Sequence, residues 1–213
     1  VYTCVQTLAS MAAMTTPFSP ATQAWFSRAF EVPTRVQSEG WPHIASGDDA
    51  LLVAPTGSGK TLAAFLWAID RLGRLPEDAA AGTRVVYVSP LKALAVDVAR
   101  NLMDPIADMG LDIRVETRTG DTPSSRRQRQ RFDPPNILMT TPEQLALMLS
   151  HKEAPKLFGS LKRVVLDELH ALALSKRGDL LALGLARLGT LCPDLRISAL
   201  SATVAKPEML REW

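Results

Sequence analysis

Short apolar runs alternate with amphipathic stretches along most of this chain, from about residue 50 onward. The apolar runs are rich in Val, Ile and Leu and show no strict alternation with polar residues. Runs of this kind are typical of strands in a sheet that is covered on both faces. The predicted strands are Ala50–Ala54, Arg84–Ser89, Ile113–Thr117, Asn136–Thr140, Arg163–Asp167 and Arg196–Ser201.

The stretches between these runs have the periodicity of helices. In residues 178–191, for example, Leu181, Leu185 and Leu188 recur at helical spacing and form one apolar face. The alternation of strands and helices predicts an α/β fold with a mostly parallel central sheet, right-handed crossovers and helices on both faces. The helices predicted after the first strand are Thr61–Leu72, Leu91–Met109, Pro142–Leu149 and Gly178–Leu191.

Composition adds little to this picture. The chain has 213 residues, of which 46% are hydrophobic and 22% charged, and its net charge of +2 neither requires nor excludes a polyanionic partner. Two cysteines, Cys4 and Cys192, indicate reduced thiols in a cytoplasmic protein rather than a disulfide framework or a metal cluster. No membrane span or secretory signal is predicted. We expect residues 1–16 to be a poorly ordered tail and residues 17–213 to form one domain.

A glycine-rich segment follows the first strand and opens a helix, which is the context of a P-loop. Residues 54–61 read APTGSGKT, with Ala in place of the usual first Gly. Glycines allow successive N–H groups to converge on phosphate oxygens, so the segment predicts nucleotide binding and phosphoryl transfer, as in kinases, GTPases, transporters and helicases alike. We expect Lys60 to neutralise the β- and γ-phosphates and the Thr61 hydroxyl to bind Mg²⁺. The other predicted nucleotide contacts in the loop are Pro55, Thr56, Gly57, Ser58 and Gly59.

Polar residues at the ends of two later strands predict the rest of a phosphoryl-transfer site. Asp167 and Glu168 end an apolar strand, where a carboxylate can hold Mg²⁺ and its neighbour can act as general base. An Asp–Glu pair alone would more often be a solvated turn, and the P-loop context favours the catalytic interpretation. His170, Ser201 and Thr203 are the predicted coupling residues, joined through the hydroxyl groups of Ser201-Ala202-Thr203.

Two helices are predicted upstream, one from Ser19–Pro20 to Phe30 and one that starts at Pro33–Thr34. The second carries Gln37, whose amide offers a donor and an acceptor that match the adenine N6/N7 edge. An exposed helical glutamine is the alternative. Phe18 has the position to stack on the base, although a core role is the favoured prediction.

Taken in order, these segments resemble the motifs of superfamily 2 DExH-box helicases, over Phe18 to Thr203. Residues 18–26 and 61–70 are most similar to the large helicase-related (Lhr) group. The resemblance implies the first RecA-like domain of an ATP-driven motor that moves 3′ to 5′ along a single strand. DNA is the favoured track, with an RNA–DNA hybrid or RNA as alternatives. His170 replaces the Asp of a strict DEAD box, which points away from RNA-only enzymes.

The same resemblance implies a set of nucleic-acid contacts where strands end and helices begin. Such contacts bind phosphates without regard to sequence. They are Pro90, Leu91, Lys92, Thr119, Gly120, Asp121, Thr141, Pro142 and Glu143. Four arginines, Arg126, Arg127, Arg129 and Arg131, follow on a predicted short helix, for which a solvated surface is the favoured interpretation.

A complete motor of this class also has a second RecA-like domain, which supplies arginine fingers worth about 10³–10⁵ in rate. The sequence to Trp213 contains no such segment, so we expect it to be part of a longer protein. By itself it should bind ATP weakly, hydrolyse it very slowly and unwind nothing. The alternatives are a DExH-type RNA helicase, a P-loop ATPase without a nucleic-acid partner, and a catalytically silent interaction module.

Overall fold

The computed structural model describes residues 17–76, 82–204 and 207–213, so the predicted N-terminal tail lies outside the described residues. Six strands form a single sheet in the order β1-β6-β5-β2-β4-β3, and every neighbouring pair is parallel. The predicted parallel α/β architecture is therefore confirmed. The strands are β1 Ala50–Val53, β2 Val85–Val88, β3 Val115–Arg118, β4 Ile137–Thr140, β5 Arg163–Leu166 and β6 Arg196–Ser201.

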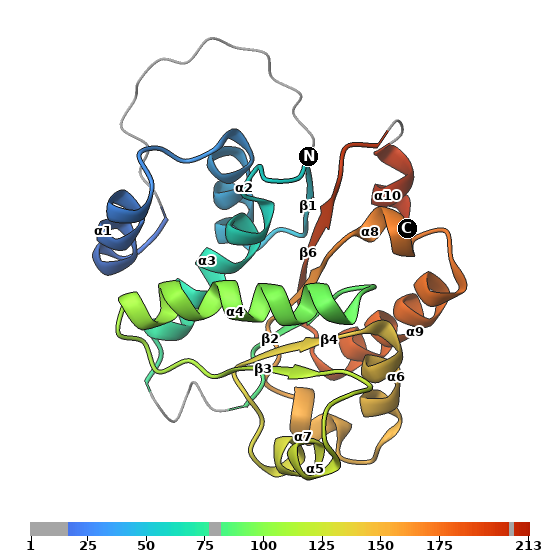
Figure 1. Ribbon diagram of the computed structural model, residues 1–213. Coiled ribbons are helices and arrows are strands. Elements are labelled where there is room, and N and C mark those ends of the chain that lie inside the picture. The colour runs from blue at the N-terminus through green and yellow to red at the C-terminus, as the bar shows by residue number, and fades with distance from the viewer. Residues whose placement is uncertain (1–16, 77–81, 205–206) are drawn as a thin grey trace.

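Helices cover both faces of the sheet (Figure 1). In β2, Val85 and Tyr87 belong to the core on one face, and Val86 and Val88 belong to the core on the other. Burial on both sides explains why the strand sequences lack alternation. One face packs against α2 Arg35–Ser46, α3 Lys60–Gly73 and α4 Lys92–Asp108; the other packs against α6 Pro142–Ser150, α7 Ala154–Phe158, α8 Leu169–Leu172 and α9 Lys176–Leu191.

Most predicted elements agree with these bounds to within two residues. The largest strand difference is at β3, where the prediction began at Ile113 and the strand begins at Val115. The N–H of Arg114 donates to the side-chain oxygen of Asn136 at 2.7 Å, and the register pairs of β3 with β4 begin at Val115 and Ile137. The remaining helices are α1 Pro20–Ala29, α5 Ser124–Phe132 and α10 Glu208–Glu212.

An aromatic cluster holds α1 against α2 and α3. Phe18 is 6% exposed and meets Trp41 edge to face, with ring centroids 4.8 Å apart at 87°. Its favoured core role is therefore confirmed. The N–H of Ser19, the N-cap residue of α1, donates to the buried Asp70 carboxylate of α3 at 2.8 Å. Among the described residues, no helix is both long and apolar enough to cross a membrane.

Candidate active site and nucleic-acid interface

The P-loop connects β1 to α3 and has the strained backbone that glycine permits. Gly57 and Gly59 have φ values of 80° and 84°, in the left-handed region. Lys60 is the first residue of α3, and its Nζ donates to the carbonyl oxygens of Ala54 at 2.5 Å and Pro55 at 2.7 Å. The lysine side chain therefore lies across the loop. We expect phosphate oxygens of a bound nucleotide to replace these two carbonyl oxygens as its hydrogen-bond acceptors.

Two further features of the loop fit a triphosphate. The Ser58 hydroxyl is buried and has no hydrogen-bond partner among the residues that the structure describes, which is costly unless a ligand supplies one. Among the described residues no N-cap side chain binds the start of α3, so its first N–H groups remain available to an anion. Thr61 lies in this first turn, where its hydroxyl is suited to Mg²⁺. The described residues contain no cluster of three or more Asp, Glu, His or Cys, and Mg²⁺ in such sites shares its ligands with substrate phosphates.

Asp167 directly follows β5 and is 6% exposed. Its Oδ1 accepts from the N–H of Glu168 at 2.8 Å, and its Oδ2 accepts from the hydroxyl of Tyr87 at 2.6 Å. Burial, together with the charge of Asp167, raises the pKa of the Tyr87 phenol far above its ordinary value. The phenol therefore keeps its proton and acts as a donor. Sequence reasoning did not find Tyr87, because it is one residue of an apolar run.

The predicted general base has an unusual backbone. Glu168 has φ 49° and ψ 44°, and it is the one non-glycine residue with a positive φ among those described. Strain of about 1–3 kcal/mol at such a residue is typical of active sites. The left-handed conformation of Glu168 ends the extended backbone that precedes it in β5. Its Oε2 lies 3.4 Å from Nε2 of His170.

The predicted coupling residues come together in part. The other imidazole nitrogen of His170, Nδ1, lies 3.1 Å from the hydroxyl oxygen of Ser201. The carbonyl oxygen of Ser201 accepts from the N–H of Ala54 at 3.2 Å. Ser201 therefore connects the P-loop to the Asp167–His170 segment, as the sequence predicted. Thr203 is exposed, and no side-chain hydrogen bond of Thr203 is present in the described part of the chain.

Gln37 has structural partners that the sequence analysis did not assign. The residue is 3% exposed; its Oε1 accepts from the N–H of Thr34 at 3.0 Å, as in a capping box. Its Nε2 donates to the carbonyl oxygen of Gly59 at 3.4 Å. The amide thus fixes the start of α2 against the P-loop. Recognition of adenine by the remaining N–H of the amide stays a prediction.

The predicted nucleic-acid contacts lie at the carboxyl ends of three adjacent strands. Pro90–Lys92 follows β2, Thr141–Glu143 follows β4, and Thr119–Asp121 follows β3. The N-cap residues Leu91 of α4 and Thr141 of α6 make no side-chain cap hydrogen bond. Uncapped N–H groups at helix starts are suited to phosphate oxygens.

All three charged residues of the predicted contact set already bind other side chains. Lys92 Nζ is 3.0 Å from both carboxylate oxygens of Asp121, in an exposed ion pair. The Glu143 carboxylate binds Arg177 of α9, and this bond lowers the pKa of Glu143. Glu143 thereby joins α6 to α9, and its carboxylate also accepts from its own backbone N–H and from the Thr141 hydroxyl. These assignments as nucleic-acid contacts stay predictions.

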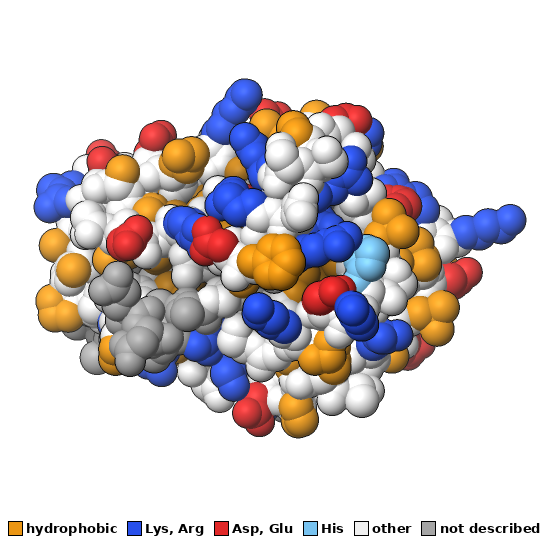
Figure 2. All heavy atoms as spheres, turned by 90° about the horizontal axis from the view of Figure 1, so that it is seen from below, with side chains coloured by type: hydrophobic (Ala, Val, Ile, Leu, Met, Phe, Trp, Pro, Cys, Tyr) orange, Lys and Arg blue, Asp and Glu red, His pale blue; other side chains and the backbone are white. Residues whose placement is uncertain are grey.

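The arginine run on α5 is only partly a solvated surface. Arg126 and Arg129 are exposed, and Arg129 pairs with Glu116 at 2.7 Å, in agreement with the prediction. Arg127 and Arg131 are half-buried, and their Nε atoms have no partner in the described part of the chain, so for them the prediction was wrong. They lie on the same side of α5, because positions 127 and 131 are four residues apart in the helix. Lys and Arg side chains gather over this face of the molecule (Figure 2).

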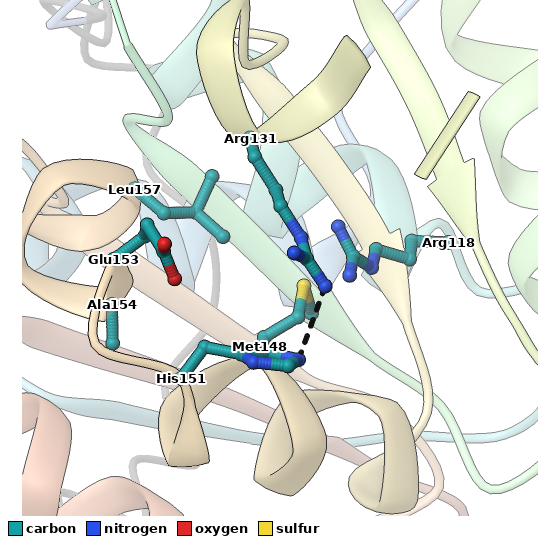
Figure 3. A pocket seen from close by; sticks show the side chains of 7 residues that line it. All are labelled: Arg118, Arg131, Met148, His151, Glu153, Ala154 and Leu157. Carbon is teal, nitrogen blue, oxygen red and sulfur yellow. Dashed lines mark hydrogen bonds between the residues drawn. The ribbon is translucent and has the colours of Figure 1, made fainter. Parts of the chain in front are cut away.

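Beneath α5 lies a small hollow of about 10 Å³. Arg118, at the end of β3, is 4% exposed, and its guanidinium points toward that of Arg131 (Figure 3). Arg118 donates to the carbonyl oxygen of Arg127 at 3.2 Å, and no acidic side chain pairs with it among the described residues. Burial and the neighbouring arginines lower the pKa of Arg118. The hollow lies apart from the P-loop and Asp167.

Comparison with known proteins places this arrangement in a family. A family model for DEAD/DEAH box helicases matches residues 34–210. The "Lhr helicase/ probable uracil glycosylase" of Mycolicibacterium smegmatis is 50% identical over 203 residues, which cover 90% of this chain and 13% of the relative. The "Lhr helicase/uracil glycosylase" of Escherichia coli is 48% identical over 207 residues, which cover 88% of this chain and 13% of the relative.

A solved structure gives the same result. The structure of the Mycobacterium smegmatis helicase Lhr bound to ssDNA and AMP-PNP has a TM-score of 0.85 and 47% identity, covering 91% of this chain and 26% of that one. The chain therefore spans only a small part of the relatives that it matches. The predicted similarity to Lhr helicases is confirmed. Because the family model covers most of the chain, this protein belongs to the DEAD/DEAH box helicase family.

Proposed function

We propose that this chain is the ATP-binding motor domain of a nucleic-acid-dependent ATPase, a 3′-to-5′ helicase of Lhr type whose track is single-stranded DNA. One observation carries the proposal. The P-loop, the Asp167–His170 segment and Ser201 lie at the ends of three adjacent strands, and the uncapped starts of α4 and α6 lie at the ends of the next ones. Nucleotide and polyanion sites thus share one edge of the sheet.

In this proposal each residue of the nucleotide site has one task. Lys60 moves from the carbonyl oxygens of Ala54 and Pro55 to the β- and γ-phosphates. Thr61 and Asp167 hold Mg²⁺, which when bound neutralises charge on the phosphates. Glu168 orients the attacking water and takes its proton at a carboxylate oxygen.

His170 and Ser201 couple this site to the rest of the domain. His170 touches both Glu168 and Ser201, so a movement of the general base is transmitted to the end of β6. We propose that a second RecA-like domain, elsewhere in a longer protein, supplies the arginine that completes the site. The 213 residues alone should therefore hydrolyse ATP very slowly.

The test is an ATPase assay of the full-length protein with DNA and RNA strands of matched sequence. We expect stimulation by single-stranded DNA, no nucleotide binding by Lys60→Ala, and normal nucleotide binding by Glu168→Gln with a turnover about 10²–10⁴-fold lower. An unchanged rate in Glu168→Gln would show that the general base is another residue. Stimulation by RNA alone would show that the track is RNA and not DNA. An ATPase rate that no polynucleotide changes would overturn the proposal.

A further inference from the structure

Tyr87 lies within β2, and its side chain is fully buried. It pairs in register with Val165 of β5, so its ring lies beside the last residues of that strand. The ring also packs against Phe65 of α3, with centroids 5.6 Å apart. A buried phenol needs a hydrogen-bond partner, and here the partner is the Asp167 carboxylate at 2.6 Å.

Both oxygens of Asp167 are restrained by this arrangement. Oδ2 accepts from the Tyr87 hydroxyl, and Oδ1 accepts from the N–H of Glu168 at 2.8 Å. Hydrogen bonds to a charged acceptor are short and roughly twice as strong as neutral ones. Each carboxylate oxygen has a second lone pair, so two restraints fix the plane of the group and still leave acceptor sites for an ion or its water.

We propose that Tyr87 is a positioning residue that orients the Asp167 carboxylate for the magnesium ion of Mg–ATP. The inference rests on the proposed function, which assigns Asp167 to the metal. A phenol suits this task because it restrains the carboxylate without neutralising it. A lysine or arginine at position 87 would bring a positive charge that competes with the ion.

The test is a Mg²⁺ titration of the full-length protein in the presence of a fluorescent ATP analogue, with nucleotide binding as the signal. Tyr87→Phe removes the hydroxyl and keeps the ring in its contact with Phe65. We expect the apparent Kd for Mg²⁺ to rise about tenfold, at the low end of the range for groups that orient a metal ligand. Binding of the analogue without Mg²⁺ should not change.

Thr83→Val is the matched control. The Thr83 hydroxyl is also fully buried and hydrogen-bonded, to the carbonyl oxygen of Pro135 at 3.0 Å, but it lies just before β2 begins, away from Asp167. Both variants lose one buried hydrogen bond, so both should melt at a lower temperature than the wild type. Only Tyr87→Phe should alter the Mg²⁺ titration.

The possible outcomes distinguish a failure of the Tyr87 positioning role from a failure of the proposed function. If Tyr87→Phe titrates with Mg²⁺ like the wild type and Thr83→Val, the positioning role is overturned and the proposed function stands. An equal loss of affinity with and without Mg²⁺ would also overturn it, since a general distortion of the pocket has that effect. If the wild-type protein shows no Mg²⁺-dependent nucleotide binding, the proposed function fails and the inference falls with it.

Discussion

Alanine substitutions at three glycines test how the P-loop is held in place. Gly57 has φ 80° and open space where a Cβ would lie; Gly59 has φ 84° and a Cβ position 2.5 Å from Gln37 Nε2. Gly189 is helical and exposed, with nothing within 4 Å of its Cβ position. The substitution at Gly57 therefore carries only the backbone penalty, and the one at Gly59 carries that penalty and a steric conflict. The substitution at Gly189 carries neither.

The expected free energies of unfolding follow from these geometries. Gly57→Ala should lose about 1–2 kcal/mol, the cost of a left-handed backbone for a residue with a Cβ. Gly59→Ala carries the same cost and also displaces the buried Gln37 amide. Its bonds to Gly59 and Thr34 contribute about 0.5–1.5 kcal/mol each, so the total loss is roughly 2–5 kcal/mol. Gly189→Ala should gain about 0.5–1 kcal/mol from helix propensity.

The measurement is urea unfolding of the 213-residue chain, followed by circular dichroism, with a common slope checked across the three variants. A larger loss for Gly59→Ala than for Gly57→Ala is the decisive result. If the two variants lose the same free energy, Gln37 does not seat against the loop as the structure shows. The proposed link between α2 and the nucleotide site would then have to be abandoned.

Two further predictions concern charged groups. If the proposed function holds, Asp121→Asn should release Lys92 from its ion pair and tighten single-stranded DNA binding a few-fold at low salt, and less so at high salt. A filter-binding assay measures this change. The control is Asp194→Asn, which removes an exposed ion-pair partner that precedes β6. Arg118→Met should leave stability unchanged or raise it by about 1–2 kcal/mol, because an apolar side chain replaces a buried cation that has one carbonyl contact and no acidic partner among the described residues. Arg163→Met should instead lose about 1–3 kcal/mol, because Arg163 is buried but hydrogen-bonded on both sides; equal urea midpoints for the two arginine variants would contradict this reasoning.

Much of the nucleotide site is predictable from sequence because its residues are placed by local geometry. Lys60 and Thr61 open a helix, and Asp167 and Ser201 lie where buried strands end. In a parallel sheet the carboxyl ends of all strands meet at one edge. Strand–helix alternation alone therefore predicts that these side chains come together. The same reasoning placed the starts of α4 and α6 at that edge.

The contacts that sequence reasoning missed depend on long-range pairing. Tyr87 and Asp167 are 80 residues apart, and their bond requires β2 to lie beside β5, an order that the strand patterns do not contain. Arg177 likewise binds Glu143 only because α6 packs on α9. One missed contact had a local signal: Thr34 and Gln37 have the spacing of a capping box. That spacing would have identified the partner of Gln37 without the structure.

In the strand order, the pair of β2 and β5 lies at the boundary between the two predicted sites. Along the carboxyl edge, β1, β6 and β5 end in the predicted nucleotide residues, whereas β2, β4 and β3 end in the predicted nucleic-acid contacts. The boundary between the two halves is crossed by the Tyr87–Asp167 bond and by the Asp167 N–H, which donates to the carbonyl oxygen of Val88 at 2.9 Å. Lys92 follows Val88 by only four residues. If the proposed phosphate contacts at the start of α4 shift β2, we expect the carboxylate of Asp167 to move with that strand, because hydrogen bonds join Asp167 to Tyr87 and Val88.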